Sequence, residues 1–381
     1  MRITGVRTLC LTRVHEPDRM WFTSNFRVIK ADAVIVVVET DAGLVGIGEA
    51  SPYGGPRLIE SWVRRLEPGL VGADPDDPGL ALSPHGRDRA YDCAVAGLDC
   101  ALWDLRGKRM GAPVASLLNP GWPREIRVYA SGGCDYDWRD RPESLIDEVL
   151  EYQRRGLTAC KIRVGTRWEW DRVTPERFLD LVRTLRQAVG ADMEIMVDGN
   201  CRLTLQEALV VGRGLDRLGI TWFEEPIDRT DLDGYLALQR EVEVPLSAGE
   251  GFATLERFLP FIEARAYDIV QPDTALTGIT EGLRIAAAAE RSGLDTVPHS
   301  WHNGLMAMEN AHYVAGLPRP RILELCMIQG PLQWGLLADP PPISGDRLHL
   351  PDRPGFGVSI REGAAEEFPH VEGNYAIEVV R

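Results

Sequence analysis

The sequence predicts an α/β protein built from a TIM-type (β/α)7-8 barrel, preceded by an α+β domain to which the end of the chain returns. Three observations predict this architecture. The 381 residues are too many for one ordinary compact core and suit two domains, or one barrel with an appendage. The first part reads as a hairpin followed by a helix, and a regular alternation of strand and helix patterns begins near residue 124.

The α+β domain is expected over residues 1–123. Residues 31–51 alternate in polarity around the turn sequence TDAG, which predicts a β-hairpin. Residues 91–113 then place Val95, Leu98, Leu102 and Leu105 at helical spacing before a glycine and a proline.

The barrel is expected over residues 124–345. Helical patterns such as residues 175–190 and 255–265 separate short β-branched runs, and eight such units predict a (β/α) barrel. A proline-rich segment at 340–357 stands where the last helix would be, so residues 346–381 are expected to return to the first domain. The strand candidates are residues 126–131, 159–164, 194–199, 220–226, 245–250, 267–273, 294–300 and 321–327.

The charge balance limits the classes of partner. Asp and Glu number 57 against 42 Lys and Arg, a formal charge of −15, which disfavours nucleic acid and anionic membranes. No apolar run approaches about 18 residues and the first residues lack an export signal, so we expect a cytoplasmic protein. Seven scattered cysteines without a CxxC pattern indicate reduced thiols. We expect a small-molecule carboxylate substrate and a homo-oligomer.

Acidic residues follow the predicted barrel strands, whose carboxyl ends gather around one pocket. Asp198, Glu224 and Glu250 close three consecutive strands, and three carboxylates in one pocket would repel each other without a hard cation. Oxygen ligands favour Mg²⁺, so we assign these three residues to a Mg²⁺ site. Any one of them alone could instead be a helix N-cap or a solvated loop residue.

Further strand ends supply a base and two cations. Asp273 and His299 end adjacent strands, and a carboxylate bonded to one ring nitrogen makes the other a positioned general base. His302 lies three residues further on and competes with His299 for the role of base; it is also a candidate substrate contact. Lys161 and Arg163 lie two residues apart on one strand and therefore point to the same side, which predicts an anion beside them.

The sequence resembles the enolase superfamily, specifically its mandelate racemase subgroup. The ordered acids, the Asp and His on the next two strands, and the stretches GIGEASPYGG and AGLDCALWDLRGK carry the likeness over nearly the whole chain. The resemblance implies a capping domain, a substrate carboxylate on Mg²⁺, and an enediolate stabilised by the cations. It also implies that Glu324 hydrogen-bonds the enediolate and that Asn200 contacts a hydroxyl beside the substrate carboxylate.

Arg163 departs from the Lys-x-Lys pattern common in that family, whose second lysine can act as a base. Holding an arginine neutral at pH 7 costs about 9 kcal/mol, so Arg163 is a poor base and His299 is the one clear base. One-sided chemistry favours a lyase that dehydrates an acid sugar to a 2-keto-3-deoxy acid. Three alternatives remain open. In the first, Lys161 is a second base and the protein is a racemase or epimerase. In the other two, the protein is a cycloisomerase or a catalytically silent metal-binding barrel.

Two loops of the first domain are expected to close the pocket over the substrate. Residues 19–26 and 51–56 combine aromatic side chains with glycine or small polar residues, as mobile lids do. Trp21 and Tyr53 are therefore candidate substrate contacts. The alternative for Trp21 and Phe22 is that they are core or interface residues.

Overall fold

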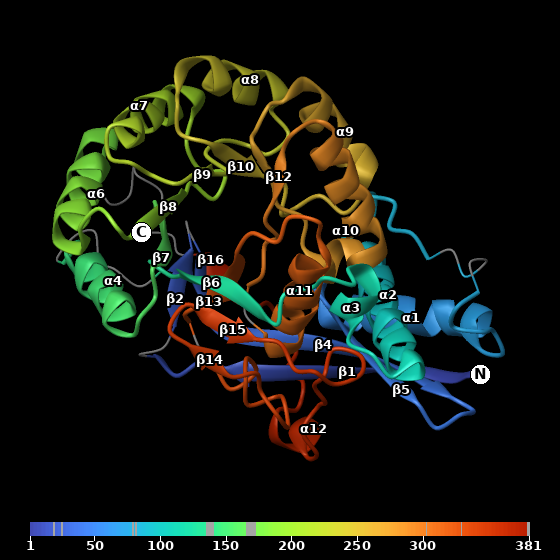
Figure 1. Ribbon diagram of the computed structural model, residues 1–381. Coiled ribbons are helices and arrows are strands. Elements are labelled where there is room, and N and C mark those ends of the chain that lie inside the picture. Colours follow the sequence, from blue (N-terminus) through green and yellow to red (C-terminus); the bar gives the residue numbers. More distant parts are fainter. Residues whose placement is uncertain are drawn as a thin grey trace.

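The structure is a computed structural model that describes residues 1–381 except 18–19, 24–25, 78–79, 81, 135–140, 165–172, 302, 329 and 379–381. Two parts are evident in Figure 1: a ring of helices around short strands, and a flat sheet with its own helices packed against that ring. The predicted fold class, a capped (β/α) barrel, is confirmed.

The capping domain is a three-stranded antiparallel sheet covered by helices. The sheet order is β1 (Ile3–Val14), β4 (Lys30–Thr40) and β5 (Val45–Ala50), so the predicted hairpin at 31–51 is the β4–β5 pair. The helix predicted over 91–113 is α2 (Arg89–Met110), whose N-cap Asp88 accepts hydrogen bonds from two backbone amides. The remaining helices are α1 (Pro56–Leu70), α3 (Val114–Leu118) and the 3₁₀ turn η2 (Pro52–Gly54).

Within this domain, α2 packs closely against β5. A Cβ placed on Gly48 would lie 2.2 Å from the backbone oxygen of Gly97, and one on Gly46 would lie 2.2 Å from that of Ala101. Only glycine permits this approach of helix to strand. The loop that follows β5 is thereby fixed beside the start of α2, and both enter the site described below.

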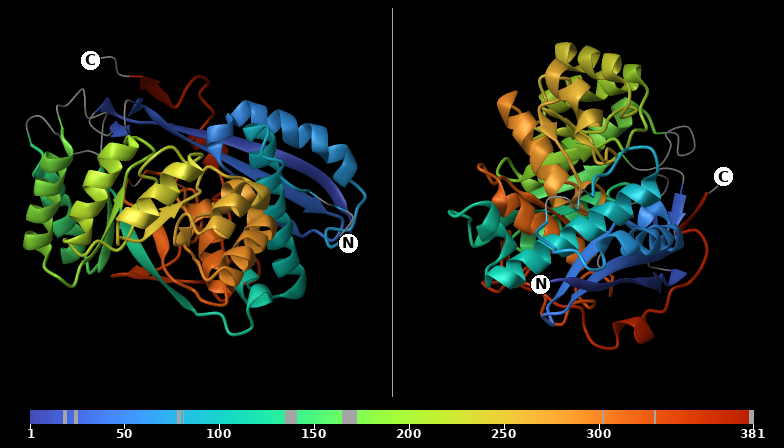
Figure 2. Two further views of the ribbon diagram at one scale, coloured as in Figure 1. Left: turned by 90° about the horizontal axis from the view of Figure 1, so that it is seen from above. Right: turned by 90° about the vertical axis from the view of Figure 1, so that its right-hand side faces the viewer.

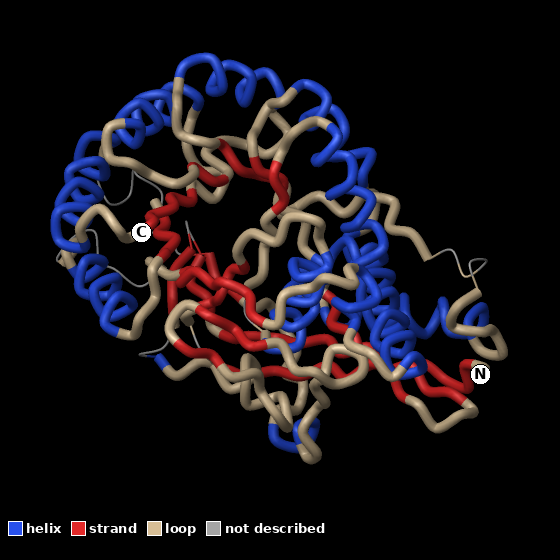
Figure 3. The backbone as a smooth tube through the Cα atoms, viewed as in Figure 1, coloured by secondary structure: helices blue, strands red, loops and turns tan. Residues whose placement is uncertain are grey.

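All eight predicted barrel strands form. They pair in parallel in the order β12, β11, β10, β9, β8, β7, β6, and β13 pairs with the other side of β6. Figure 3 shows these strands inside the ring of helices. The strands are β6 (Glu125–Ser131), β7 (Ala159–Arg163), β8 (Glu194–Asp198), β9 (Phe223–Glu224), β10 (Leu246–Ala248), β11 (Ile269–Val270), β12 (Asp295–Thr296) and β13 (Leu323–Cys326).

The helices alternate with these strands along the chain. Their bounds are α4 (Ser144–Arg154), α6 (Pro175–Val189), α7 (Leu205–Asp216), α8 (Leu232–Glu241), α9 (Leu255–Ala264), α10 (Thr274–Arg291) and α11 (Gly304–Gly316). After β13 the described residues form turns and then the hairpin β14 (Ile343–Ser344) and β15 (Arg347–His349), with β15 antiparallel to β6. No helix within the described residues has the length and apolar character needed to cross a membrane.

The C-terminal segment runs back along the capping domain. Gly355 bridges Pro113, Pro369 bridges Leu11, and the short helix α12 (Ala364–Glu367) precedes this second contact. A small sheet then joins β16 (Ala376–Glu378) to β3 (Phe26–Val28), which pairs with β2 (Trp21–Thr23). Figure 2 shows this last segment beside the capping strands. The domain boundaries at 123 and 345 remain a prediction.

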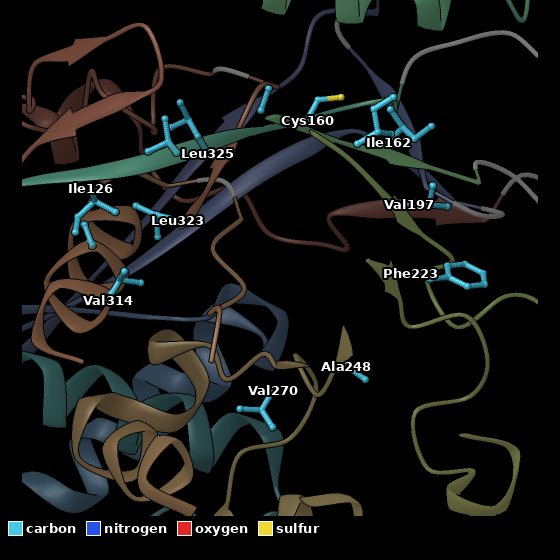
Figure 4. Close-up of a cluster of buried hydrophobic side chains, with 14 of the residues drawn as sticks. Ile126, Cys160, Ile162, Val197, Phe223, Ala248, Val270, Val314, Leu323 and Leu325 are labelled. Carbon is cyan, nitrogen blue, oxygen red and sulfur yellow. The ribbon is translucent and has the colours of Figure 1, made fainter. Parts of the chain in front are cut away.

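The alternation of side chains along the barrel strands separates core from site. Outward residues such as Cys160, Ile162 and Val197 pack into the layer beneath the helices (Figure 4). Inward residues Ala159, Met196 and Trp222 belong to a separate apolar cluster inside the barrel. Two residues further along each strand, the same inward face carries Lys161, Asp198 and Glu224. The polar layer therefore lies on the apolar one.

Candidate active site

A cavity of about 350 Å³ lies at the carboxyl ends of the barrel strands. The barrel loops, the capping domain and the C-terminal segment all contribute to its wall, so the site is complete only when the two domains are packed together. The residues that line it are Trp21, Ser51, Tyr53, Arg89, Arg163, Asn200, Arg202, Arg229, Glu250, Asp273, His299, Trp301 and Tyr375.

A buried lysine sits among acids beside this cavity. The Lys161 ammonium forms ion pairs with Glu224, with Glu324 at 2.9 Å, and with Asp198 at 3.9 Å. All four side chains are almost fully buried. Burial alone would lower the pKa of Lys161, but the carboxylates outweigh it and hold that pKa well above its ordinary value.

The three predicted metal ligands follow three neighbouring strands, β8, β9 and β10. Burial, and then repulsion from Glu224, raise the pKa of Asp198 to about 7. This is the effect expected of acids crowded together without enough positive charge. Oxygen donors of this kind suit Mg²⁺. As the side chains stand, no three His, Cys, Asp or Glu groups in the described part of the chain are arranged to hold a metal ion.

Both carboxylate oxygens of Glu224 are held by neighbouring side chains. One oxygen pairs with Lys161, and the other accepts hydrogen bonds from Trp222 Nε1 at 3.0 Å and Gln271 Nε2 at 2.7 Å. The next residue, Glu225, has its own partner, because its carboxylate pairs with Arg229 at 2.7 Å. Of the two consecutive glutamates, the first therefore belongs to the buried acid cluster.

The loop after β8 is held in an uncommon backbone conformation. Asn200 and Cys201 have positive φ values of 47° and 58°. Asn200 tolerates this region, and its backbone and side-chain nitrogens bond both Asp198 oxygens at 2.7 and 2.8 Å. The Cys201 amide donates to the Glu225 carbonyl at 2.7 Å. These bonds fix the Asp198 carboxylate at the end of its strand.

The Asp–His pair is formed at the ends of β11 and β12. Asp273 is the N-cap of α10, with one oxygen accepting from the Ala275 amide at 2.9 Å and the other lying 2.8 Å from His299 Nδ1. His299 Nε2 lies 3.5 Å from Glu250. Burial would lower the pKa of His299, but Glu250 and the bond to Asp273 raise it to about 10.

Arg163, the last residue of β7, also lines the cavity. Its guanidinium stacks 4.0 Å from the centre of the Trp301 ring. Trp301 in turn packs edge-on against Trp21, with ring centres 5.6 Å apart. This stacking arrangement suits a planar guanidinium better than an ammonium. Burial works against the charge of Arg163, yet its neighbours keep its pKa above the ordinary value, so it remains a cation.

The other sequence-predicted residues are placed as follows. Asn200, Trp21 and Tyr53 line the cavity. Glu324, on β13, is buried and accepts from the Ser300 amide at 2.8 Å as well as pairing with Lys161. As an ionised acceptor it would need a proton before it could donate to an enediolate. His302 and residues 19, 24 and 25 of the first predicted lid lie outside the described residues.

Sequence reasoning missed several residues of the cavity wall. Trp301 and Arg229 follow strand ends that had been recognised, so their positions in the βα loops were a usable signal. Arg89 begins α2 and Tyr375 lies near the end of the chain, and only the packing of distant segments brings them to the pocket. No local sequence pattern predicts such contacts.

The capped barrel gathers buried carboxylates, an Asp–His pair and two cations at its strand ends. This arrangement is typical of enzymes that remove a proton next to a carboxylate. The chain belongs to the enolase superfamily, in its mandelate racemase subgroup. Residues 144–364 match the enolase C-terminal domain-like family, and residues 3–119 match the mandelate racemase / muconate lactonizing enzyme N-terminal domain.

Its relatives include sugar-acid enzymes of two kinds. An arabinonate dehydratase of Saccharolobus solfataricus is 34% identical over 96% of this chain and 99% of its own. A D-galactarolactone cycloisomerase of Agrobacterium fabrum is 31% identical over 97% and 99%. Among solved structures, an enolase superfamily member from Polaromonas superposes with a TM-score of 0.88 at 32% identity, covering 98% of this chain and 99% of that one.

Proposed function

We propose that this chain is a Mg²⁺-dependent lyase that dehydrates an acid sugar to a 2-keto-3-deoxy acid. The observation that carries the proposal is that His299, paired with Asp273, lines the same cavity as an arginine in the position where a second lysine could act as a base. The similarity to sugar-acid dehydratases over nearly the whole chain supports it.

In this proposal Asp198, Glu224 and Glu250 hold Mg²⁺. When bound, the ion supplies positive charge next to the substrate carboxylate and lowers the energy of its enediolate. Lys161 and Arg163 add fixed positive charge from β7. Because the site is buried, these charges act through a medium that screens them less than water does.

The residues of the chain then perform the proton transfers. His299 Nε2 removes the proton on C2 of the substrate, and the electron pair of the C–H bond moves into the carboxylate to give the enediolate. The electrons return to form a C2–C3 double bond as the C3–O bond breaks. The leaving hydroxyl takes a proton and departs as water. The resulting enol gains a proton at C3, loses the proton of its C2 hydroxyl and becomes the 2-keto-3-deoxy acid.

Arg163 is the reason to prefer elimination over epimerisation. An epimerase must remove a proton on one face and deliver one on the other. Arg163 stays protonated and is stacked on Trp301, so it is suited to hold charge and not to exchange protons. If Lys161 acted as a base, the epimerase would become the better description.

A cycloisomerase is the second candidate, favoured by the 31% identity to the Agrobacterium fabrum enzyme over nearly the full length of both chains. Cycloisomerisation of a lactone would use the same α-proton abstraction and differ in the leaving group. The substrate distinguishes the two, since an open-chain acid loses water whereas a lactone opens without releasing it.

The test is a screen of acid sugars and their lactones with the Mg²⁺-loaded protein in D₂O. Formation of a 2-keto-3-deoxy acid from an open-chain acid is the expected result. Solvent deuterium at C2 without a keto acid would show epimerase chemistry instead, and conversion of lactones alone would show a cycloisomerase. Full activity after removal of all divalent cations would contradict the metal assignment.

A further inference from the structure

The rim of the cavity carries more positive charge than abstraction of one proton beside one carboxylate requires. Four arginines line it: Arg89, Arg163, Arg202 and Arg229. Arg229 is neutralised by Glu225 at 2.7 Å and Glu250 at 3.6 Å. Arg163 stacks on Trp301 next to the acid cluster, where the reacting carboxylate is to bind.

Arg89 differs from these two arginines. Its guanidinium makes no hydrogen bond and no ion pair with any residue in the ranges that the structure describes. The chain carries a net charge of −15, so acidic side chains are abundant for pairing elsewhere. An arginine that faces a ligand cavity without an acidic partner is a ready site for an anion.

Arg89 and Arg202 line the same cavity as Tyr375, and the three residues come from different parts of the fold. Burial raises the pKa of Tyr375, and the two charges that oppose this rise are Arg89, at the start of α2, and Arg202, in the loop after β8. Tyr375 packs edge-on against Tyr53, with ring centres 5.1 Å apart. The capping domain, the C-terminal segment and a barrel loop thus bring two guanidinium groups to one side of the cavity.

We propose that Arg89, with Arg202 beside it, binds a second anionic group of the substrate, the distal carboxylate of an aldaric acid. The inference rests on the proposed function, in which the first carboxylate occupies the Lys161 and Arg163 end. A guanidinium matches the two oxygens of a carboxylate with two parallel hydrogen bonds. A cavity of about 350 Å³ is at the small end for ligand pockets and suits a single six-carbon chain.

The experiment compares matched acids that differ only at C6. Each aldarate is paired with the aldonate of the same configuration, for example galactarate with galactonate, and an aldonate bearing a terminal phosphate forms a third arm. Dissociation constants are measured by titration calorimetry in the Mg²⁺-loaded His299→Asn variant, in which turnover is blocked. Values of kcat/KM are measured in the unmodified protein.

The expected result is a preference for the best aldarate over its aldonate of about tenfold or more, as one charged hydrogen-bonded contact would give. Arg89→Gln should reduce this preference ratio by a similar factor. Arg87→Gln, which removes a neighbouring exposed arginine that does not line the cavity, should leave the ratio unchanged.

Three outcomes would overturn the inference: equal binding of aldarates and aldonates, a ratio that Arg89→Gln does not alter, or a stronger Arg89-dependent preference for the terminal phosphate. None of these touches the proposed function, which fails separately if no acid of any series is converted to a 2-keto-3-deoxy acid. An aldonate dehydratase would confirm the proposed function but would show no preference for aldarates.

Discussion

His299 Nδ1 lies 2.8 Å from an Asp273 oxygen, and the same Asp273 carboxylate caps α10 through the Ala275 amide. The helix therefore fixes the Asp273 carboxylate, and this carboxylate in turn orients the imidazole ring. An ionised carboxylate can only accept, so a neutral imidazole keeps its proton on Nδ1 and leaves Nε2 for the substrate. Because the pKa of His299 is raised, Nε2 has to lose a proton before it can act as the base. Asp273 positions the base, and α10 positions Asp273.

Removal of the base should separate chemistry from metal binding. His299→Asn is expected to abolish both dehydration and exchange of the C2 proton, because it deletes the base and keeps the three acids. The measurements are keto acid formation, deuterium incorporation by NMR, and Mg²⁺ titration. His302→Asn should have a milder effect, and the reverse order of the two variants would make His302 the base.

Adjacent glutamates at the end of β9, Glu224 and Glu225, offer a matched test of the metal site. Glu224→Gln should weaken Mg²⁺ binding and activity strongly, and Asp198→Asn and Glu250→Gln should do likewise. Glu225→Gln removes the same charge one residue away, but this side chain pairs with Arg229. Its Mg²⁺ affinity should stay near that of the unmodified protein. Equal losses in the two neighbouring variants would mean that the metal assignment on β9 is wrong.

A buried pair of acids where β5 meets α11 predicts a pH dependence of stability. Glu309 accepts a hydrogen bond from the Glu49 amide at 2.6 Å, and both side chains are fully buried. Burial, and then Glu49, raise the pKa of Glu309 well above its ordinary value. The folded protein therefore keeps a proton here that the unfolded chain loses above its own pKa. This contribution to stability is complete at low pH and declines as the pH rises.

Glu309→Gln should reduce that decline. Glutamine retains an oxygen acceptor for the Glu49 amide and has no proton to lose. Between about pH 5 and pH 8 the variant should gain stability relative to the unmodified protein by up to about 1.4 kcal/mol per pH unit. Thermal unfolding at several pH values measures this difference, with the exposed Glu366→Gln as a control for charge. A constant difference between variant and unmodified protein across this range would contradict the prediction.

The barrel could be predicted from sequence because its strands carry two signals at once. In β7, Cys160 and Ile162 pack outward while Lys161 and Arg163 point inward, so one pentapeptide shows both the core face and the site face. The contacts of Arg89 and Tyr375 with the cavity could not be predicted in this way. They depend on how the capping domain and the chain end pack on the barrel, and neither residue lies in a pattern that fixes this packing.

Arg163 should act as a fixed charge in catalysis. Arg163→Met removes the cation and keeps a long side chain that can still pack on Trp301. We expect turnover to fall by about 3 kcal/mol of transition-state stabilisation, or about a hundredfold, by comparison with the loss of other oxyanion donors. Steady-state kinetics and Mg²⁺ titration would check this, since metal binding should be retained. A loss confined to KM would show that Arg163 binds ground state and transition state equally.

Arg163→Lys tests whether this one residue limits the protein to one-sided chemistry. The lysine retains a positive charge but loses the planar stacking on Trp301, so native turnover should fall. Unlike arginine, a lysine beside Lys161 and the metal could lose its proton and act from the wall opposite His299. The variant should therefore gain C2 proton exchange on acids of the opposite configuration, to which the unmodified protein should be nearly inert. The measurement is deuterium incorporation into both C2 epimers. Exchange of both at similar rates by the unmodified protein would mean that a second base already exists, with Lys161 the first candidate, and would favour an epimerase over a dehydratase.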